Sequence, residues 1–264
     1  MKRVLIIDGH NFLFKSFAVP FKFNSKKGTP LHVVTTFLSL LRRSLLIVKA
    51  ESLTVVFDSQ TARNNSLLSS EYKANRKNDY SAEKDSPFSH LPLIKKVLDL
   101  LGIQWIEHAD YEADDVVASI SQSLQRQHNC KVTIASTDSD FFQLLSSNVS
   151  ILRIITKKNT VLCEQKWFKK RFGFEPSLYV NFKSLVGDPI DNVKGISGIG
   201  PKRAALIIKG KKNWPLSQEE LSLLRVNNAI ILLKDDISLT VNVQKNTRLL
   251  LKLPNKKVFA LCNF

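Results

Sequence analysis

VLIID, at residues 4–8, is a short aliphatic run that ends in an aspartate. Two further β-branched runs also end in acidic residues, LTVVFD at residues 53–58 and KVTIASTDSD at residues 131–140, and a fourth short run, IQWIE, occupies residues 103–107. Helical patterns separate these runs, at residues 31–49, 90–101 and 112–127. Buried strands that alternate with helices are typical of a parallel sheet covered on both faces. The sequence therefore predicts an α/β fold with a parallel, twisted sheet and helices on both of its faces.

Two parts of the chain depart from this alternation. Residues 59–87 are polar and rich in Arg, Lys, Asn and Ser, and the stretch is too long for a simple connector, so it is either a functional excursion or a disordered loop. From about residue 175 the pattern changes to helices with a glycine-punctuated turn. We therefore expect one domain at residues 1–174 and a second at residues 175–264.

The charge of the chain points to a polyanionic partner. The 264 residues include 39 Lys and Arg against 23 Asp and Glu, a net charge of +16, which favours nucleic acid first and an anionic membrane surface second. No stretch approaches the ~18 apolar residues of a membrane-spanning helix, and the aliphatic run before Asp8 is too short for a signal-peptide core. The three cysteines are scattered and fit free thiols in a reducing compartment. We expect a soluble intracellular protein that is not secreted.

The stretch YEADDVVASI, at residues 111–120, places Glu112, Asp114 and Asp115 directly before an apolar helical run. Acidic residues in the first turn of a helix satisfy free N–H groups and complement the helix dipole, so capping alone explains this stretch when it is taken by itself. The alternative is that these carboxylates belong to a larger set.

Carboxylates from four separate segments are expected at one edge of the sheet. Because the carboxyl ends of parallel strands meet at one edge, that edge should collect Asp8, Asp58, Asp138, Asp140, Glu112, Asp114 and Asp115. Capping explains one such residue well but explains seven poorly, since like charges at this density repel unless cations neutralise them. No cluster of Lys or Arg lies beside these positions in the sequence. Oxygen-only ligands favour Mg²⁺ or Mn²⁺, and two such ions ~3.5–4 Å apart would serve phosphodiester hydrolysis.

A second motif, GDPIDNVKGISGIGPKRAA, occupies residues 187–205. Gly195, Gly198 and Gly200 allow a tight turn with exposed backbone N–H groups, which can hold phosphates at the start of the following helix. Lys202 and Arg203 follow the turn, and Asp188 and Asp191 add to the acidic set from this side. The alternative is an ordinary helical hairpin with a solvated basic face.

Together these motifs resemble the 5′-nuclease family, which includes the 5′–3′ exonuclease domain of bacterial DNA polymerase I, free-standing 5′–3′ exonucleases and flap endonucleases. DGHNFLFKSF is similar to the opening strand-and-helix motif of that family, VVFD to its second acidic strand, and EYKANR to its arch segment. YEADD and TDSDFFQLL match the next two acidic motifs, and GDPIDNVKGISGIGPKRA matches the helix–three-turn–helix element. The matches keep the family order over about three quarters of the chain, from residue 4 to about residue 208.

The resemblance implies a PIN-like nuclease domain with an arch at about residues 59–90, followed by a helix–three-turn–helix domain. It implies one metal ion held by Asp8, Asp58, Glu112 and Asp114, and a second held directly or through water by Asp115, Asp138, Asp140 and Asp191, with Asp188 nearby. Lys73 and Arg76 match arch residues that reach the scissile phosphate, and such a cation can stabilise charge in the transition state. Their alternative is surface charge on a loop.

Further DNA contacts and a monovalent ion also come from the resemblance. Phe14 and Lys15 match positions that stack a terminal base and touch a phosphate, although a core role for Phe14 is an equal alternative. The whole expected DNA-binding set is Phe14, Lys15, Arg63, Tyr72, Gly195, Gly198, Gly200, Lys202 and Arg203. A K⁺ ion is expected at backbone carbonyls around Leu185, Val186, Ile196 and Ile199.

The expected activity is that of a metal-dependent 5′–3′ exonuclease or flap endonuclease. Its substrate would be branched, nicked or 5′-ended duplex DNA, cut by two Mg²⁺ or Mn²⁺ ions during primer removal or repair, by a cytoplasmic, nucleoid-associated monomer. One alternative is a catalytically weak, structure-specific DNA-binding module. A second is a PIN-type ribonuclease, which shares the sheet and the acids but normally lacks the GISGIG element.

Overall fold

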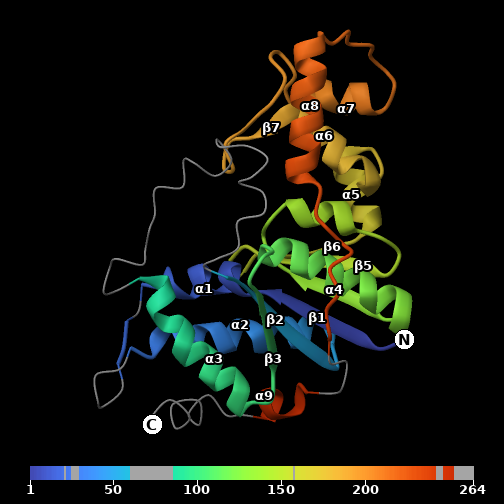
Figure 1. Cartoon of the computed structure of the whole chain (residues 1–264). Coiled ribbons are helices and arrows are strands. Elements are labelled where there is room, and N and C mark those ends of the chain that lie inside the picture. Colours follow the sequence, from blue (N-terminus) through green and yellow to red (C-terminus); the bar gives the residue numbers. More distant parts are fainter. Residues whose placement is uncertain (21, 25–29, 60–85, 157, 242–245, 253–264) are drawn as a thin grey trace.

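The computed structural model describes residues 1–20, 22–24, 30–59, 86–156, 158–241 and 246–252 (Figure 1). Four predicted site residues lie outside these ranges, namely Arg63, Tyr72, Lys73 and Arg76. Within the described ranges, no helix combines the length and apolar character needed to cross a membrane.

Six strands form one sheet in the order β3-β2-β1-β4-β5-β6. All neighbouring pairs are parallel except β5 and β6. The strands are β1 (Arg3–Asp8), β2 (Ser52–Asp58), β3 (Gln104–His108), β4 (Lys131–Ala135), β5 (Val149–Ile154) and β6 (Thr160–Cys163). The prediction of a largely parallel α/β sheet is confirmed. Because β1 lies between β2 and β4, the strand order reverses there, and such a switch point is where open α/β sheets hold their ligands.

The period-two alternation of each strand divides the core into two layers. Leu5 and Ile7 of β1 pack into one hydrophobic cluster, whereas Val4 and Ile6 pack into another on the opposite face. The first cluster is covered by α1 (Gly9–Phe17), α2 (His32–Val48) and α3 (Leu91–Leu100), and the second by α4 (Ala113–His128) (Figure 1). The sheet is therefore buried on both sides, which explains its continuous aliphatic strands.

The middle of the chain contains two strands that were not predicted from the sequence. The predicted helices correspond to α2, α3 and α4, but the sequence analysis did not anticipate the antiparallel pair of β5 and β6. β6 has only four residues and lies at the edge of the sheet, so its pattern is too short to be distinctive. Two short 3₁₀ helices, η3 (Pro87–His90) and η4 (Asp140–Leu144), also occur in this part of the chain.

The chain after β6 forms a helical end that stands beyond α4 (Figure 1). It contains α5 (Gln165–Phe172), η5 (Pro176–Leu178), α6 (Tyr179–Val186), β7 (Gly187–Asp188), β8 (Val193–Lys194), α7 (Pro201–Ile208) and α8 (Gln218–Ile231). Edge-on contacts among the aromatic rings of Phe142, Phe168 and Tyr179 join this end to the sheet layer. One hydrophobic core thus extends across residue 174.

After α8 the chain returns along α4 to the far end of the sheet (Figure 1). Ser119 Oγ of α4 donates to the Lys234 carbonyl at 3.0 Å, and Gln122 Nε2 donates to Asp235 at the same distance. The Asn246 side chain then pairs with both the N–H and the carbonyl of Leu53, just before α9 (Arg248–Lys252). This return segment ties the helical end to the sheet.

Candidate active site

The carboxyl edge of the sheet presents the carboxylates that the strand pattern predicted. Asp8 is the last residue of β1 and Asp58 the last residue of β2, and Asp138 lies in the loop after β4. Since these three strands are neighbours, their acidic ends converge at the switch point of the sheet.

In the described part of the chain, Asp8 accepts its hydrogen bonds from neutral donors. Its Oδ1 accepts the backbone N–H of Asn11 at 3.0 Å, which caps α1, and its Oδ2 accepts the hydroxyl of Ser136 at 2.7 Å. Burial raises the pKa of Asp8 to about 6, against the lowering effect of the two hydrogen bonds, and the nearby charges of Asp58 and Asp138 raise it further. A cation bound among these carboxylates would offset their mutual repulsion and favour the ionised form of Asp8.

Asp58 links the sheet edge to the start of α4. Its Oδ1 accepts the N–H of Ala113 at 2.7 Å, so the residue next to Glu112 is anchored directly to β2. The Asp58 N–H donates to Nδ1 of His10 at 2.9 Å, and the same nitrogen lies 3.0 Å from Asp58 Oδ2. The acidic first turn of α4 is thereby fixed beside the ends of β1 and β2.

The three acids of that first turn differ in their surroundings. Glu112 is the N-cap residue of α4 with an extended backbone and no side-chain capping bond, and Asp114 accepts the N–H of Asp115 at 2.8 Å. Asp115 is only 1% exposed, and its Oδ1 accepts the N–H of Lys234 at 2.8 Å. Asp115 therefore anchors the return segment, a role that the sequence analysis did not anticipate.

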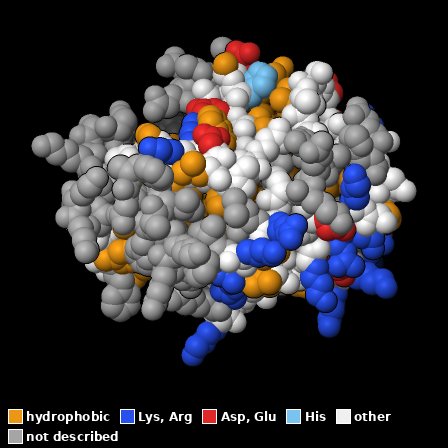
Figure 2. Space-filling view, turned by 90° about the horizontal axis from the view of Figure 1, so that it is seen from below, with side chains coloured by type: hydrophobic (Ala, Val, Ile, Leu, Met, Phe, Trp, Pro, Cys, Tyr) orange, Lys and Arg blue, Asp and Glu red, His pale blue; other side chains and the backbone are white. Residues whose placement is uncertain are grey.

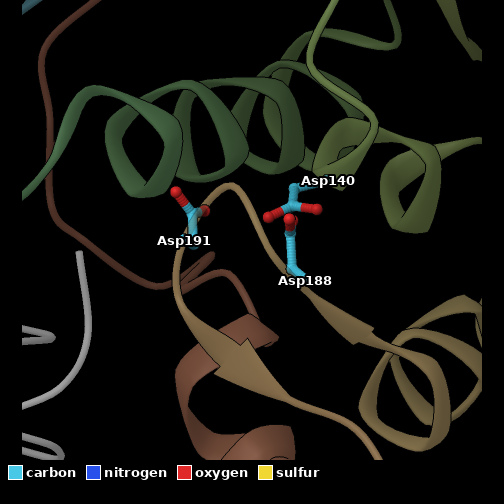
Figure 3. A group of neighbouring side chains, drawn as sticks. All are labelled: Asp140, Asp188 and Asp191. Carbon is cyan, nitrogen blue, oxygen red and sulfur yellow. The ribbon is translucent and has the colours of Figure 1, made fainter. Parts of the chain in front are cut away.

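A second carboxylate group joins the sheet layer to the helical end. Ligand oxygens of Asp140, Asp188 and Asp191 all lie within 4.8 Å of one another. In Figure 3 the Asp188 carboxylate is directed toward that of Asp140, and Asp191 stands on the same loop as Asp188. Asp140 begins η4, whereas Asp188 ends β7, so two segments far apart in the sequence build this group. The grouping suits a divalent cation with oxygen ligands.

Lys183 of α6 forms ion pairs within this group, and it was not among the predicted site residues. Its ammonium contacts Asp140 Oδ1 and lies 2.5 Å from Asp188 Oδ2. Burial alone would lower the pKa of Lys183, but the two carboxylates outweigh it and raise that pKa above its usual value. The signal available in the sequence was a lysine inside the apolar helix YVNFKSLV, five positions before Asp188.

The acids that pair with Lys183 respond differently to it. Burial raises the pKa of Asp140 to about 6, and the charge of Asp138 adds to that rise while Lys183 opposes it. For Asp188 burial also favours the neutral form, but the hydrogen bond and charge of Lys183 prevail, so its pKa is lowered.

Lys15 and Thr137 form a polar junction next to Asp8. Lys15 Nζ donates to Asn11 Oδ1 at 2.7 Å and to Thr137 Oγ1 at 3.0 Å, and Arg153 donates to the Thr137 carbonyl at 2.7 Å. Burial lowers the pKa of Lys15 to about 8, with Asp8 opposing the shift. Phe14, one residue earlier, is 39% exposed and lies against Phe88, so it is not a fully buried core residue.

The glycine turn of the helical end is closely packed. A Cβ at Gly195 would lie 2.2 Å from the Val186 carbonyl oxygen, so only glycine fits there. Gly198 has φ of +76°, and its carbonyl accepts a hydrogen bond from Arg203. Gly200 is the N-cap residue of α7. An open hollow at this turn is lined by Gly198, Gly200, Pro201, Lys202, Arg203, Leu206 and Lys212.

The guanidinium of Arg203 also lies over the Trp214 ring, 4.6 Å from its centroid, while Lys202 is exposed. Figure 2 shows that Lys and Arg side chains also gather toward one side of the face seen from below, so positive charge is not confined to the turn.

The carbonyls expected to bind K⁺ come from two adjacent segments. The N–H of Ile196 donates to the Leu185 carbonyl at 2.9 Å, and the N–H of Ile199 donates to the Ile196 carbonyl at 3.0 Å. The Val186 carbonyl lies against Gly195. The fold thus brings the four predicted residues together, and the ion itself stays a prediction.

Comparison with known proteins gives one family model and many relatives. The model of the 5′-3′ exonuclease, N-terminal resolvase-like domain, matches residues 3–173. A 5′-3′ exonuclease of Aquifex aeolicus (strain VF5) is 34% identical over 232 residues, which is 83% of this chain and 76% of that relative. The thermostable DNA polymerase I of Thermus thermophilus is 33% identical over 207 residues, which is 78% of this chain but 24% of that longer protein.

Solved structures share the fold at lower identity. The bacteriophage T5 flap endonuclease, solved as a pseudo-enzyme–product complex with DNA and metal ions, has a TM-score of 0.66 and 20% identity, covering 87% of this chain and 86% of that chain. Flap endonuclease-1 from Methanococcus jannaschii has a TM-score of 0.58 and 17% identity, covering 99% of this chain and 90% of that chain.

Proposed function

Because this chain belongs to the 5′–3′ exonuclease family, we propose that it is a structure-specific 5′-nuclease that hydrolyses phosphodiester bonds of DNA. The observation that carries the proposal is the convergence of Asp140, Asp188 and Asp191 from two distant segments, beside the strand ends that carry Asp8 and Asp58. A carboxylate array of this kind at the switch point of a parallel sheet suits metal-assisted hydrolysis.

The residues present fit two divalent cations, with Mg²⁺ or Mn²⁺ as our choice. Asp8, Asp58, Glu112 and Asp114 would hold the first ion. Asp138, Asp140, Asp188 and Asp191 would hold the second, with Asp115 at the margin because its Oδ1 is taken by the Lys234 N–H. Bound ions would supply an activated water and stabilise the charge that develops on the phosphate. The protein supplies their positions through Ser136, Asn11 and the Ala113 N–H.

We assign duplex binding to the turn before α7. Its N–H groups, with Lys202 and Arg203, form a positive site that can hold phosphates without reading sequence. The bacteriophage T5 relative was solved with DNA and metal ions, which supports DNA as the substrate class. Branched, nicked or 5′-ended duplex is the form we propose, with K⁺ at the carbonyls of Leu185, Val186, Ile196 and Ile199.

The remaining parts of the proposal rest on the family. Lys73 and Arg76 of the arch would reach the scissile phosphate, Arg63 and Tyr72 would contact the DNA, and Phe14 and Lys15 would meet its 5′ end. Residues 1–174 would form the nuclease domain and residues 175–264 the helix–three-turn–helix domain. We propose a monomer that acts in primer removal or repair in the cytoplasm, associated with the nucleoid.

Cleavage of a 5′-labelled flap duplex tests the proposal. The wild type, an Asp138→Ala, Asp140→Ala variant and a control, Glu219→Ala, are each assayed with Mg²⁺ and with EDTA. Glu219 is an exposed acid of α8, so its loss should leave cutting unchanged. We expect metal-dependent cleavage near the junction in the wild type and the control, and DNA binding without cleavage in the double variant. Asp138→Asn, at an exposed position, gives a second variant with less risk of misfolding.

Two outcomes would replace the proposal. Binding without cleavage by the wild type in both Mg²⁺ and Mn²⁺ would assign the chain as a catalytically weak DNA-binding module. Faster cleavage of RNA than of the DNA flap would assign it as a PIN-type ribonuclease.

A further inference from the structure

Lys183 occupies an unusual position for a lysine. It is 7% exposed, and its ammonium contacts carboxylates that come from opposite sides of the junction between the sheet layer and the helical end. A buried ammonium is costly unless carboxylates pair with it, and lysine is among the residues that are least often fully buried. Its placement therefore reflects the acids around it.

The geometry places the ammonium where a metal ion would bind. Asp140 and Asp188 belong to the group whose ligand oxygens lie within 4.8 Å of one another, and Lys183 Nζ bonds to one oxygen of each. The second oxygen of Asp188 accepts the Ile190 N–H at 2.9 Å. A divalent ion that uses Asp188 must therefore share or take an oxygen that already accepts a bond, whereas at Asp140 the ammonium holds only Oδ1.

We propose that Lys183 is a built-in cation of the second carboxylate group, which holds Asp140 and Asp188 together in the metal-free protein and gives up Asp188 when a divalent ion binds. This rests on the proposed function, since it takes that group to be a metal site. Lys183 keeps the acids assembled before metal arrives, and it lowers the affinity of the site because the two cations compete.

The position of Lys183 on α6 links this exchange to the DNA-binding turn. α6 leads directly into Gly187 and Asp188, and its Leu185 carbonyl accepts the N–H of Ile196 from the turn. The ammonium therefore belongs to the same helix that supports the turn, so metal loading and duplex binding would both involve α6.

The test compares Lys183→Met with Lys170→Met in the DNA-free protein. Met keeps the length and apolar stem of lysine without its charge, and Lys170 is an exposed lysine of α5. In EDTA we expect Lys183→Met to melt ~6 °C or more below the wild type, because buried carboxylates lose their partner. Mn²⁺ should restore most of that loss in Lys183→Met and shift Lys170→Met no more than it shifts the wild type.

Mn²⁺ titration followed by electron paramagnetic resonance gives the second measurement. We expect the weaker Mn²⁺ site of Lys183→Met to bind ~5-fold or more tightly than that of the wild type, as removal of a competing cation requires. Weaker or unchanged Mn²⁺ binding in Lys183→Met would overturn the proposal and leave Lys183 as a group that assists the metal.

Two more variants keep the result interpretable. Lys183→Met combined with Asp140→Asn should melt in EDTA above Lys183→Met alone, because the unpaired buried charge has been removed. Lys183→Arg, which retains a cation, should keep the wild-type dependence of melting on Mn²⁺. If neither of these two expected results is observed, Lys183 has only a packing role. None of these measurements uses nuclease activity, so an inactive wild type would refute the proposed function while tight Mn²⁺ binding by Lys183→Met would still support the cation exchange.

Discussion

The two carboxylate groups of this protein are assembled by different means. At the sheet edge, Asp8 and Asp58 are fixed by strand ends and by neutral donors, the Ser136 hydroxyl and backbone N–H groups of Asn11 and Ala113. At the junction with the helical end, Asp140 and Asp188 are bridged by the ammonium of Lys183. The first group is held by topology, and the second is held by an internal cation.

This difference follows from where the acids come from. β1 and β2 are hydrogen-bonded neighbours, so their ends meet whether or not any charge is neutralised. Asp140 and Asp188 lie on η4 and β7, which belong to no common sheet, so nothing in the backbone ladder brings them together. A group built from separate elements needs an attraction of its own, and a buried ion pair provides it.

Asparagine substitutions should separate the two groups most strongly. Asp8→Asn and Asp140→Asn should each reduce flap cleavage by roughly 10³-fold, since a lost metal ligand removes several kcal/mol of transition-state stabilisation. Their stabilities without metal should change in opposite directions. Asp8→Asn removes a buried charge and should stabilise the protein, whereas Asp140→Asn leaves Lys183 short of a partner and should cost about 3 kcal/mol.

Urea unfolding in EDTA, with Glu219→Gln as the control, measures these stabilities. If both variants were destabilised equally, the two groups would not differ in how they are held, and the comparison would fail.

The pH dependence of stability should reveal the burial of Asp8 in the first group. Burial raises the pKa of Asp8 from 3.8 to about 6 in the folded protein, so between these values the native state keeps a proton that the unfolded chain has released. Stability of the metal-free protein should therefore increase as pH falls from above 6 toward 4, by on the order of 3 kcal/mol from this residue. The difference between wild type and Asp8→Asn, measured by urea unfolding at pH 8 and pH 5 in EDTA, isolates that contribution.

Metal should oppose this trend. A protonated Asp8 is a poor ligand, so Mg²⁺ binding should weaken below pH 6, and saturating Mg²⁺ should move the stability maximum toward higher pH. A wild type and an Asp8→Asn variant with the same pH profile in EDTA would show that Asp8 is not the strained group.

The contrast between the groups also explains what the sequence could predict. Asp8 and Asp58 could be predicted because a buried strand leaves a recognisable aliphatic run in the sequence, and the last residue of a parallel strand lies at the carboxyl edge of the sheet. Glu112 and Asp114 follow the same logic through the start of α4. The β5 and β6 pair was missed, since a four-residue edge strand leaves almost no periodicity.

Local patterns could not assign Ser136 or His10, and they marked Lys183 only as a lysine within an apolar helix. Each acts across a long distance in the sequence, and only the fold brings Lys183 to Asp140 or His10 to Asp58. Asp115 shows that a motif can also predict a role that does not describe all that the residue does in the fold. Its motif predicts a metal ligand, but the structure shows one of its oxygens bound to the Lys234 N–H.

Gly195→Ala tests whether backbone packing positions the second group. An added Cβ would lie 2.2 Å from the Val186 carbonyl oxygen, so the end of α6 and the segment that follows β8 must separate, at a cost of ~1–3 kcal/mol. We expect the number of bound Mn²⁺ ions to fall from two to one, with the sheet-edge site retained.

Gly200→Ala is the matched control. Nothing lies within 4 Å of a Cβ added at Gly200, and the loss of a glycine cap costs ~1 kcal/mol at most. Retention of both ions in Gly195→Ala would show that Lys183 alone sets the second group.

Substitution of Arg203 should have the smallest effect of these changes, a modest loss of duplex affinity. It tests whether the turn of the helical end binds DNA independently of the two carboxylate groups. Its guanidinium stacks on Trp214 and donates to the Gly198 carbonyl, so it both shapes the turn and carries charge. Arg203→Ala should weaken duplex binding by ~1 kcal/mol and lower the slope of log affinity against log salt by ~1. Lys202→Ala, at an exposed position beside Arg203, should lower the slope of log affinity against log salt by a similar amount if both side chains contact phosphates.

Arg203→Lys distinguishes the two roles of Arg203, since lysine keeps the charge but loses the planar stacking on Trp214. A restored slope with reduced affinity would assign Arg203 to both tasks, and Mn²⁺ binding should be unchanged in all three variants. Loss of Mn²⁺ binding in Arg203→Ala would instead mean that the turn and the second carboxylate group are structurally coupled, because both contact α6.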